Sequence, residues 1–181
     1  MGVHWKTKQT QRNLLGKSTL AHQSSNISPV VQCIGAELVC PTGEQLVNGG
    51  FETGDFTGWT ATGGWQVVSF DKHSGTYSAY TNSDGVLEQD FSEPIHVECF
   101  TVFEVYVAGT FGGGCPPLRG RMYIDILYSD LTYTRIDWQN PSGGWHLINL
   151  LDYVETGKKV KGIRFSWVAN DVLVDDYSAV C

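Results

Sequence analysis

Residues 121–139 read RMYIDILYSDLTYTRIDWQ, and this stretch decides the fold class. In its first half Met122, Ile124, Ile126 and Tyr128 occupy every second position, with polar residues between most of them. Such alternation is typical of a β-strand that buries one face and exposes the other. A second alternating run begins after a short polar interruption, so the stretch predicts an antiparallel β-hairpin.

The loop length of this hairpin sets which side chains lie opposite each other. A two-residue loop would place Ile124 opposite Arg135, and a charge would then face the core, which is costly. A three-residue loop, residues 129–131, shifts the register by one and places Ile124 opposite Ile136. We therefore expect the three-residue loop. The outward face is then formed by Tyr123, Asp125, Tyr133, Arg135 and Asp137.

The rest of the chain repeats this pattern. Alternation recurs in TVFEVYVAG (101–109) and KGIRFSWVA (161–169). Glycine-rich breaks separate the runs, and the composition, with 21 glycines, 12% aromatic and 17% charged residues, favours short strands joined by turns. Many short strands at this spacing predict an all-β sandwich. We expect further strands near residues 64–70, 77–81, 86–91, 145–151 and 171–180.

Residues 1–45 differ from the rest and are predicted to form an extended N-terminal arm. Residues 1–36 contain four basic residues and no acid, whereas the whole chain has a charge of −7. Because the basic residues are dispersed and the remainder is acidic, we expect no nucleic-acid binding. The segment 29–40, PVVQCIGAELVC, is apolar and is predicted to act as a donor strand on a neighbouring copy. Its inter-subunit residues would be Val30, Val31, Cys33, Ile34, Leu38 and Val39.

The stretch LVNGGFETG (46–54), followed by Gly58-Trp59, resembles the opening of jelly-roll carbohydrate-binding modules of the xylan- and glucan-binding type. The resemblance continues through HSGTYSA (73–79) and ends with VLVDDY (172–177). It covers residues 46–181 and implies a jelly-roll β-sandwich for that domain. A structural calcium ion is also implied, with Glu52, Asp175 and Asp176 as ligands. Calcium prefers oxygen ligands of this kind.

A sugar-binding member of this family would present aromatic rings beside hydrogen-bonding groups on one open sheet face. The outward face of the predicted hairpin offers Tyr123 and Tyr133 with Asp125, Arg135 and Asp137. The alternative interpretation is an ordinary pair of charges across a solvated sheet surface.

The five cysteines are Cys33, Cys40, Cys99, Cys115 and Cys181. None has zinc-site spacing, and an odd number leaves at least one thiol outside internal disulfides. We expect Cys33, Cys40 and Cys181 as candidates for disulfides between chains, with inert reduced thiols as the alternative.

The sequence contains no nucleophile elbow, metalloprotease motif or phosphate-binding glycine loop, so we expect no enzyme. No apolar run has the length of a membrane span. The first residues have no apolar signal-peptide core. An extracellular location, or one on a cell, spore or virion surface, would then be reached by another route.

Two functions remain open at this point. The first is a structural subunit of a filament, appendage or coat, in which the arm joins copies of the chain into a homopolymer. Its architecture resembles the endospore appendage subunits, which pair a jelly roll with an N-terminal connector and cysteines. The alternative is a module that binds polysaccharide through an exposed sheet face. We expect the structural subunit.

Overall fold

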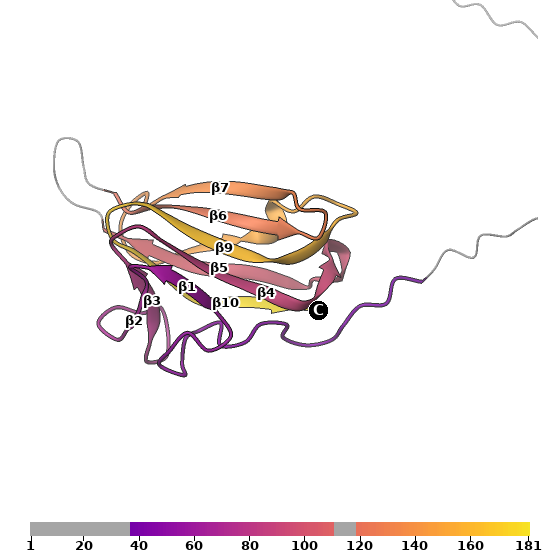
Figure 1. Cartoon of the computed structure of the whole chain (residues 1–181), viewed down its shortest axis with the longest axis horizontal. Coiled ribbons are helices and arrows are strands. Elements are labelled where there is room, and N and C mark those ends of the chain that lie inside the picture. The colour runs from indigo at the N-terminus through magenta and orange to yellow at the C-terminus, as the bar shows by residue number, and fades with distance from the viewer. Residues whose placement is uncertain (1–36, 111–118) are drawn as a thin grey trace, which may run out of the picture. The chain divides into compact units, whose positions relative to one another are not determined.

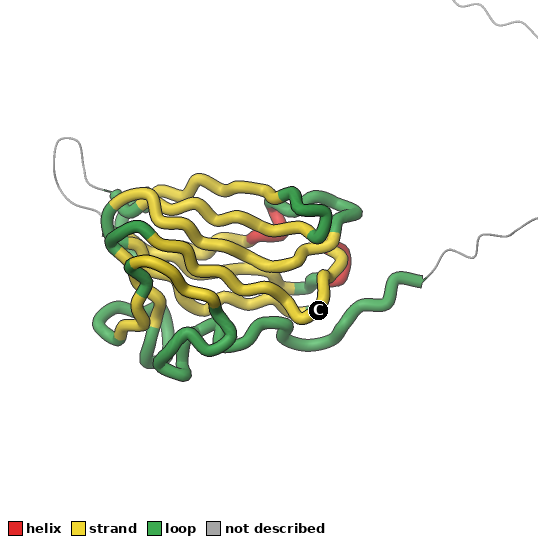
Figure 2. Tube along the Cα trace, in the orientation of Figure 1, coloured by secondary structure: helices red, strands yellow, loops and turns green. Residues whose placement is uncertain are grey.

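The computed structural model describes residues 37–110 and 119–181 of the chain. Within this part, residues Leu38–Cys181 form one compact unit. The unit is a sandwich of two antiparallel sheets (Figures 1 and 2). Its elements are β1 (Thr60–Gly63), β2 (Gln66–Val68), β3 (Ser78–Thr81), β4 (Gly85–His96), η1 (Val97–Cys99), β5 (Val102–Gly109), β6 (Arg121–Tyr128), β7 (Tyr133–Gln139), β8 (His146–Asn149), η2 (Leu150–Asp152), β9 (Lys159–Ala169) and β10 (Val172–Val180).

One sheet has the strand order β1-β4-β9-β6-β7 and the other the order β2-β3-β10-β5-β8. Apart from the consecutive pairs β6–β7 and β2–β3, neighbouring strands in both sheets are not consecutive in the chain, as in a jelly roll. The all-β sandwich expected from the sequence is therefore confirmed. A strand that was not predicted, β1, pairs with β4 at the edge of the first sheet.

The β6–β7 hairpin has the predicted register. Ile124 lies opposite Ile136, and Asp125 lies opposite Arg135. The loop is the expected three-residue one, and its last residue, Leu131, has a φ of 68°. A left-handed residue at this position is typical of three-residue hairpin loops. The length of the loop and the burial of one face of the hairpin therefore predict the same register.

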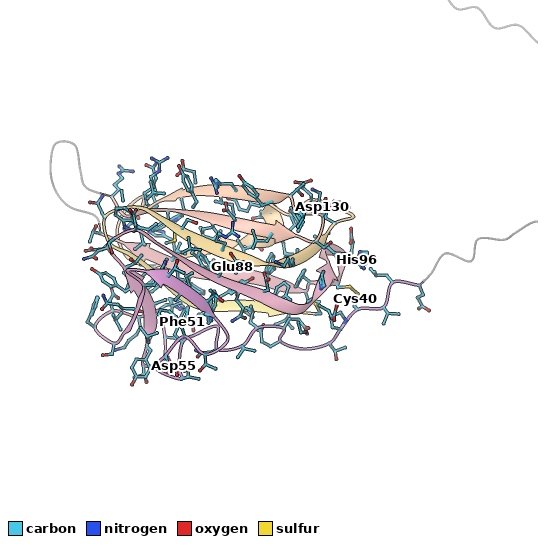
Figure 3. All side chains as sticks on the ribbon, in the orientation of Figure 1. Cys40, Phe51, Asp55, Glu88, His96 and Asp130 are labelled. Atoms are coloured by element: carbon cyan, nitrogen blue, oxygen red, sulfur yellow. A yellow bond between two sulfur atoms is a disulfide. The ribbon has the colours of Figure 1, made fainter. Side chains whose placement is uncertain are left out.

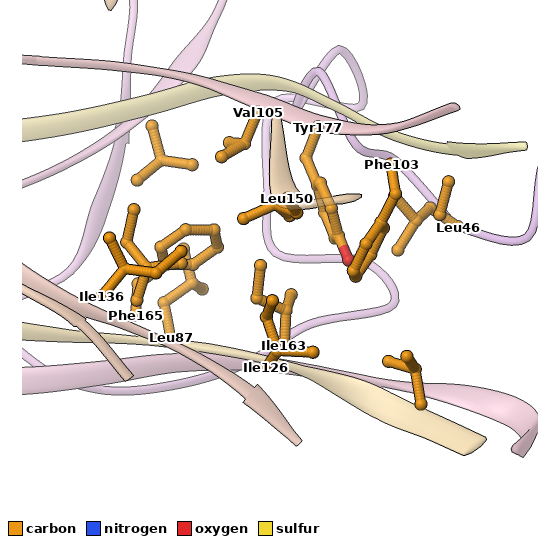
Figure 4. Packing of buried hydrophobic residues seen from close by; sticks show 14 of the residues in the cluster. Leu46, Leu87, Phe103, Val105, Ile126, Ile136, Leu150, Ile163, Phe165 and Tyr177 are labelled. Carbon is orange, nitrogen blue, oxygen red and sulfur yellow. The ribbon is translucent and has the colours of Figure 1, made fainter. Parts of the chain in front are cut away.

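The core lies between the two sheets. Phe103, Val105 and Tyr177 enter it from one sheet, and Ile126, Ile163 and Phe165 enter it from the other (Figure 4). All six are at most 3% exposed. Each side chain of this size contributes about 2–3 kcal/mol when it is removed from water.

The segment 46–54 folds as a turn that packs on β10. Phe51 is fully buried, and its ring lies 5.2 Å from that of Trp59. Gly49 is required here, because a Cβ at this position would lie 2.0 Å from the backbone oxygen of Tyr177. The Tyr177 N–H donates to the Gly49 oxygen at 3.1 Å. The glycines of this motif therefore allow the chain to contact the last strand closely.

The compact unit begins at Leu38, upstream of the expected boundary at residue 46. The backbone of Gly43 exchanges hydrogen bonds of 2.9 and 3.1 Å with Cys181. Glu44 and Val180 form an isolated antiparallel β-bridge. The Glu44 carboxylate accepts the backbone N–H groups of Gln45, Leu46 and Ala179. Residues 43–45 are therefore part of the sandwich.

Candidate functional site

The outward face of the sheet β1-β4-β9-β6-β7 carries a row of charged side chains with one member on each of four strands. Glu88 of β4 lies opposite Arg164 of β9. Arg164 lies opposite Asp125 of β6, and Asp125 lies opposite Arg135 of β7. We call these four residues the charged row. Its charges alternate in sign, and Glu88 is visible near the centre of the sheet in Figure 3.

The pair of Asp125 and Arg135 is the most buried part of the row. Arg135 donates from Nε and Nη2 to the two carboxylate oxygens of Asp125, at 2.7 and 2.8 Å. Asp125 is 0% exposed although it faces outward, whereas the Arg135 side chain is 42% exposed. The hydrogen bonds that Arg135 donates to Asp125 raise the pKa of Arg135 above its usual value. This two-point geometry fixes the plane of the guanidinium group.

Two tyrosine rings flank this guanidinium group. The Arg135 Cζ lies 4.5 Å from the centre of the Tyr123 ring and 5.1 Å from that of Tyr133. Cation–π contacts at these distances are attractive and restrict the rings. Tyr133 is 50% exposed. The predicted residues Tyr123, Asp125, Tyr133 and Arg135 are thus brought together on one face.

Asp137, the fifth predicted residue, lies on the same face and pairs with Arg121. Arg121 donates from Nε to Asp137 Oδ1 at 2.7 Å and from Nη2 to Oδ2. These hydrogen bonds lower the pKa of Asp137. Arg121 also contacts the Tyr123 ring, 5.8 Å from its centre, so the second ion pair adjoins the first tyrosine.

The prediction missed half of the charged row, because Glu88 and Arg164 belong to strands outside the hairpin. Arg164 Nε donates to Glu88 Oε2 at 2.5 Å across 76 residues of sequence. Next to this pair, Lys161 lies 2.7 Å from Asp90. Alternation in residues 161–169 does place Arg164 outward, but no local signal names its partner.

A pocket of about 260 Å³ lies at the loop end of the same face. It is lined by Leu127, Tyr128, Leu131, Thr132, Tyr133, Lys161 and Arg164. Arg164 therefore belongs both to this pocket and to the charged row. The Tyr133 ring, which flanks Arg135, lines the same pocket. The pocket combines apolar walls with cationic hydrogen-bond donors, which suits a ligand with one apolar side and several hydroxyl groups.

The three residues expected to bind calcium lie around Gly50, on the side of the segment 46–54. The position that a Gly50 Cβ would take is 3.3 Å from Asp176 Oδ1, 3.8 Å from Asp175 Oδ1 and 3.8 Å from Glu52 Cγ. Asp175 is 0% exposed, and burial raises its pKa to about 6. The oxygen donors are of the type that calcium prefers.

The carboxylates of this cluster are nevertheless engaged by protein hydrogen bonds. Glu52 accepts the backbone N–H groups of Thr76 and Tyr77, and Asp175 Oδ2 accepts that of His73 at 2.9 Å. Asp176 contacts the His73 ring at 2.6 Å. Within residues 37–110 and 119–181, no group of three His, Cys, Asp or Glu side chains is placed to hold a metal ion. In this arrangement the three carboxylates do not form a coordination sphere, and calcium stays a prediction.

The cysteine expectation needs one correction. Cys40 forms a disulfide with Cys99 in the same chain, so it does not link chains. The cause is the position of residues 38–45, which run beside the sandwich and bring Cys40 within 5.3 Å of Cys99, measured between Cα atoms. Cys181 is a free, half-buried thiol, and burial raises its pKa. Cys33 lies outside the described residues.

The donor-strand prediction concerns a contact between chains and stays a prediction. Leu38 and Val39 are 44% and 86% exposed and belong to no strand. Val30, Val31, Cys33 and Ile34 lie outside the described residues. No helix in the described part of the chain has the length and apolar composition to cross a membrane.

Comparisons with known proteins identify the fold. No protein-family model matches the sequence, and no curated protein matches it. Among solved structures, the chain is similar to TmCBM61 in complex with β-1,4-galactotriose, at a TM-score of 0.53 and 19% identity over 75% of this chain and 97% of the other. It is also similar to a family 16 carbohydrate-binding module, at a TM-score of 0.51 and 15% identity over 76% of this chain and 99% of the other. The chain therefore has the jelly-roll fold of carbohydrate-binding modules.

Proposed function

We propose that this protein is a non-catalytic module that binds polysaccharide on the outward face of the sheet β1-β4-β9-β6-β7. The observation that carries the proposal is the arrangement of Arg135, which is fixed by the buried Asp125 and lies against the rings of Tyr123 and Tyr133. Aromatic rings contact the apolar C–H side of a sugar, while charged groups bind its hydroxyls. The fold shared with carbohydrate-binding modules supports the same function.

The burial of Asp125 distinguishes this face from an ordinary solvated sheet surface. A carboxylate that loses all contact with water is expensive unless its partner has good geometry. An exposed pair needs no such arrangement and contributes little to stability. A rigid, preorganised polar group is what a ligand-binding face requires, because less ordering is then needed when the ligand binds.

The structural-subunit interpretation has less support. It relied on an arm that is free to reach a neighbour and on cysteines that link chains. Residues 43–45 pair with β10 of their own domain, and Cys40 is held by Cys99. The neighbours in fold are carbohydrate-binding modules. Polysaccharide binding, the alternative left open by the sequence, is therefore the better proposal.

We infer an extracellular setting from the disulfide. Cys40–Cys99 joins two segments that lie 59 residues apart in the sequence. Disulfides of this structural type persist in oxidising compartments and are rare in the cytosol. A polysaccharide ligand is consistent with that setting.

The test is affinity electrophoresis and calorimetry against a panel of galactan, xylan, glucan and mannan, with the Tyr133→Ala variant. We expect one polysaccharide to bind and the variant to lose about tenfold in affinity, because about 1–2 kcal/mol of ring contact is removed. Tyr153→Ala is the matched control, since Tyr153 is 44% exposed, follows η2 and belongs to no strand of the candidate face. Equal loss in both variants, or no binding to any glycan, would count against the proposal.

A further inference from the structure

The loop of the β6–β7 hairpin holds a leucine in a backbone conformation and an environment that both disfavour it. Leu131 has a φ of 68°, in the left-handed region that glycine and asparagine adopt most readily. Its side chain is 90% exposed, so burial within the domain does not compensate for this strain. Strained positions of this kind cluster at functional sites. The loop therefore has a feature that a bound group would explain.

Leu131 lies at the rim of the pocket of about 260 Å³ at the loop end of the candidate face, which we call the hairpin pocket. Leu127 forms the base of this pocket, faces outward from β6 and is 7% exposed. Opposite Leu127, β7 contributes the half-exposed ring of Tyr133, and β9 contributes Gly162, which has no side chain. The base and one wall of the pocket are therefore apolar.

The loop itself is fixed by its own hydrogen bonds. The Leu131 N–H donates to the Tyr128 oxygen at 3.1 Å, and the Tyr128 N–H donates to the Thr132 oxygen at 3.0 Å. The Thr132 hydroxyl and N–H both donate to Asp130 Oδ1, at 2.6 and 3.1 Å, and Lys158 donates to the same hydroxyl. Because the polar groups of Thr132 are used in this way, the loop offers a ligand apolar contact at a fixed rim. Asp130 marks the position of the loop in Figure 3.

The opposite wall supplies hydrogen-bond donors without a net charge. Lys161 Nζ lies 2.7 Å from Asp90 Oδ2, and Arg164 Nε donates to Glu88 Oε2 at 2.5 Å. Both cations keep further N–H donors, since an ammonium group has three and a guanidinium group five. Their charges are compensated by the two carboxylates, so a ligand carboxylate would find no uncompensated cation. A neutral acceptor, such as a carbonyl oxygen, fits this wall better.

The size of the hairpin pocket narrows the choice of bound group. At about 30 Å³ for each water, 260 Å³ corresponds to roughly nine waters, or a group of about ten non-hydrogen atoms. An acetyl group, with only a methyl and a carbonyl, would leave most of this space empty. A phenylpropenoyl group, with a benzene ring, a short carbon link and a carbonyl, has about the required size. It also combines an apolar ring with one neutral acceptor.

We propose that the hairpin pocket binds an aromatic acyl group that is ester-linked to the glycan. Its ring lies between Leu131 and Tyr133, and its carbonyl oxygen accepts a hydrogen bond from Lys161 or Arg164. Arg164 belongs to the pocket and to the charged row, so a group in the pocket adjoins a ligand on the face. This inference rests on the proposed function and names a substituent that the bound glycan carries.

The first experiment titrates the whole protein with methyl cinnamate and with the cinnamate anion, followed by ligand-observed NMR. We expect methyl cinnamate to bind with a Kd of roughly 2 mM, and the anion to bind at least about fivefold more weakly. Leu131→Ala and Leu131→Gly should each weaken binding of the ester by about fivefold. Leu131→Gly also removes the backbone strain, so this variant folds at least as well as the unaltered protein. The matched control is Leu147→Ala, which truncates an exposed leucine of β8 in the other sheet and should leave the Kd unchanged.

The second experiment uses calorimetry on each polysaccharide that binds, in its ester-bearing form and after mild alkaline removal of the esters. We expect the ester-bearing form to bind about fivefold more tightly. Leu131→Gly should abolish this difference and leave the affinity for the ester-free form unchanged.

The outcomes separate this inference from the function on which it rests. Polysaccharide binding without binding of methyl cinnamate leaves the function standing and overturns the acyl site. Equal binding of methyl cinnamate by Leu131→Gly, or tighter binding of the anion than of the ester, also overturns it. Binding of methyl cinnamate without binding of any polysaccharide overturns the proposed function, and with it the glycan as the carrier of the acyl group.

Discussion

The hydroxyl of Tyr177 offers a sharp test of the core. Its ring lies among aromatic side chains between the two sheets, with centres 6.0 Å from those of Trp59 and Phe103 (Figure 4). Burial raises the pKa of Tyr177 well above its usual value. The hydroxyl oxygen has no hydrogen-bond partner among the described residues. We predict that Tyr177→Phe stabilises the protein.

The magnitude follows from the cost of an unpaired polar group. A buried hydroxyl without a partner costs about 1–3 kcal/mol in proteins. Phenylalanine keeps the ring in place and leaves a gap of a single oxygen atom, which returns a small part of the gain. We expect the free energy of unfolding to rise by about 1 kcal/mol, and the Tm to rise by about 3 °C for a domain of this size.

The same chemical change at Tyr128 should have the opposite sign. Tyr128 is 1% exposed, but its hydroxyl lies 3.0 Å from Thr134 Oγ1 and accepts the Glu155 N–H at 2.9 Å. Removing it leaves both groups without this partner, and we expect Tyr128→Phe to cost about 1–2 kcal/mol. Both variants keep the ring and lose the same single oxygen atom, so the comparison isolates the hydrogen bonding of the hydroxyl.

The assay is urea unfolding followed by tryptophan fluorescence, with the midpoint compared at unchanged slope. A higher midpoint for Tyr177→Phe and a lower one for Tyr128→Phe would support the reasoning. A lower midpoint for Tyr177→Phe refutes it, because the hydroxyl would then contribute a favourable interaction.

Three further predictions concern the loop, the disulfide and the calcium cluster. Leu131 has a φ of 68° and is 90% exposed, so Leu131→Gly should raise the unfolding free energy by about 0.5–1 kcal/mol in the same urea assay. The double serine variant of Cys40 and Cys99 should lose about 2–4 kcal/mol, and a non-reducing gel should show no change in the fraction of linked chains. If calcium displaces the amides from Glu52, the Tm should rise by several degrees from excess chelator to millimolar calcium, and Asp176→Asn should abolish the rise. An equal Tm in both conditions would show that hydrogen bonds alone hold this cluster.

The hairpin shows why part of the site was accessible from the sequence. Alternation and loop length are local properties, and together they place Asp125 opposite Arg135 and bring Tyr123 and Tyr133 to the same face. Register in a half-buried hairpin has one good solution, because a shift by one residue exchanges the two faces. The structure has that solution.

The rest of the site depends on which strands become neighbours. Glu88 and Arg164 are 76 residues apart, and Cys40 and Cys99 are 59 apart. Nothing local to either segment specifies the other, since any outward acid on any strand is an equally good partner for Arg164. The burial of Asp125 could not be predicted from the sequence either, because it requires β7 and β9 to lie on either side of β6.

The two outward faces of the sandwich differ in a way that bears on function. On the sheet β2-β3-β10-β5-β8, the loop between β2 and β3 lies against the outward face. Its His73 ring stacks on Tyr106 with centres 3.5 Å apart, and its backbone donates to Asp175. This loop uses outward groups of β5 and β10, and they are no longer available to a ligand. On the opposite sheet, Arg135 and Tyr133 stay about half exposed although Asp125 beneath them is fully buried. On that face the buried Asp125 fixes the Arg135 guanidinium group, while Arg135 and Tyr133 stay accessible to solvent. A preorganised glycan-binding surface must meet this condition.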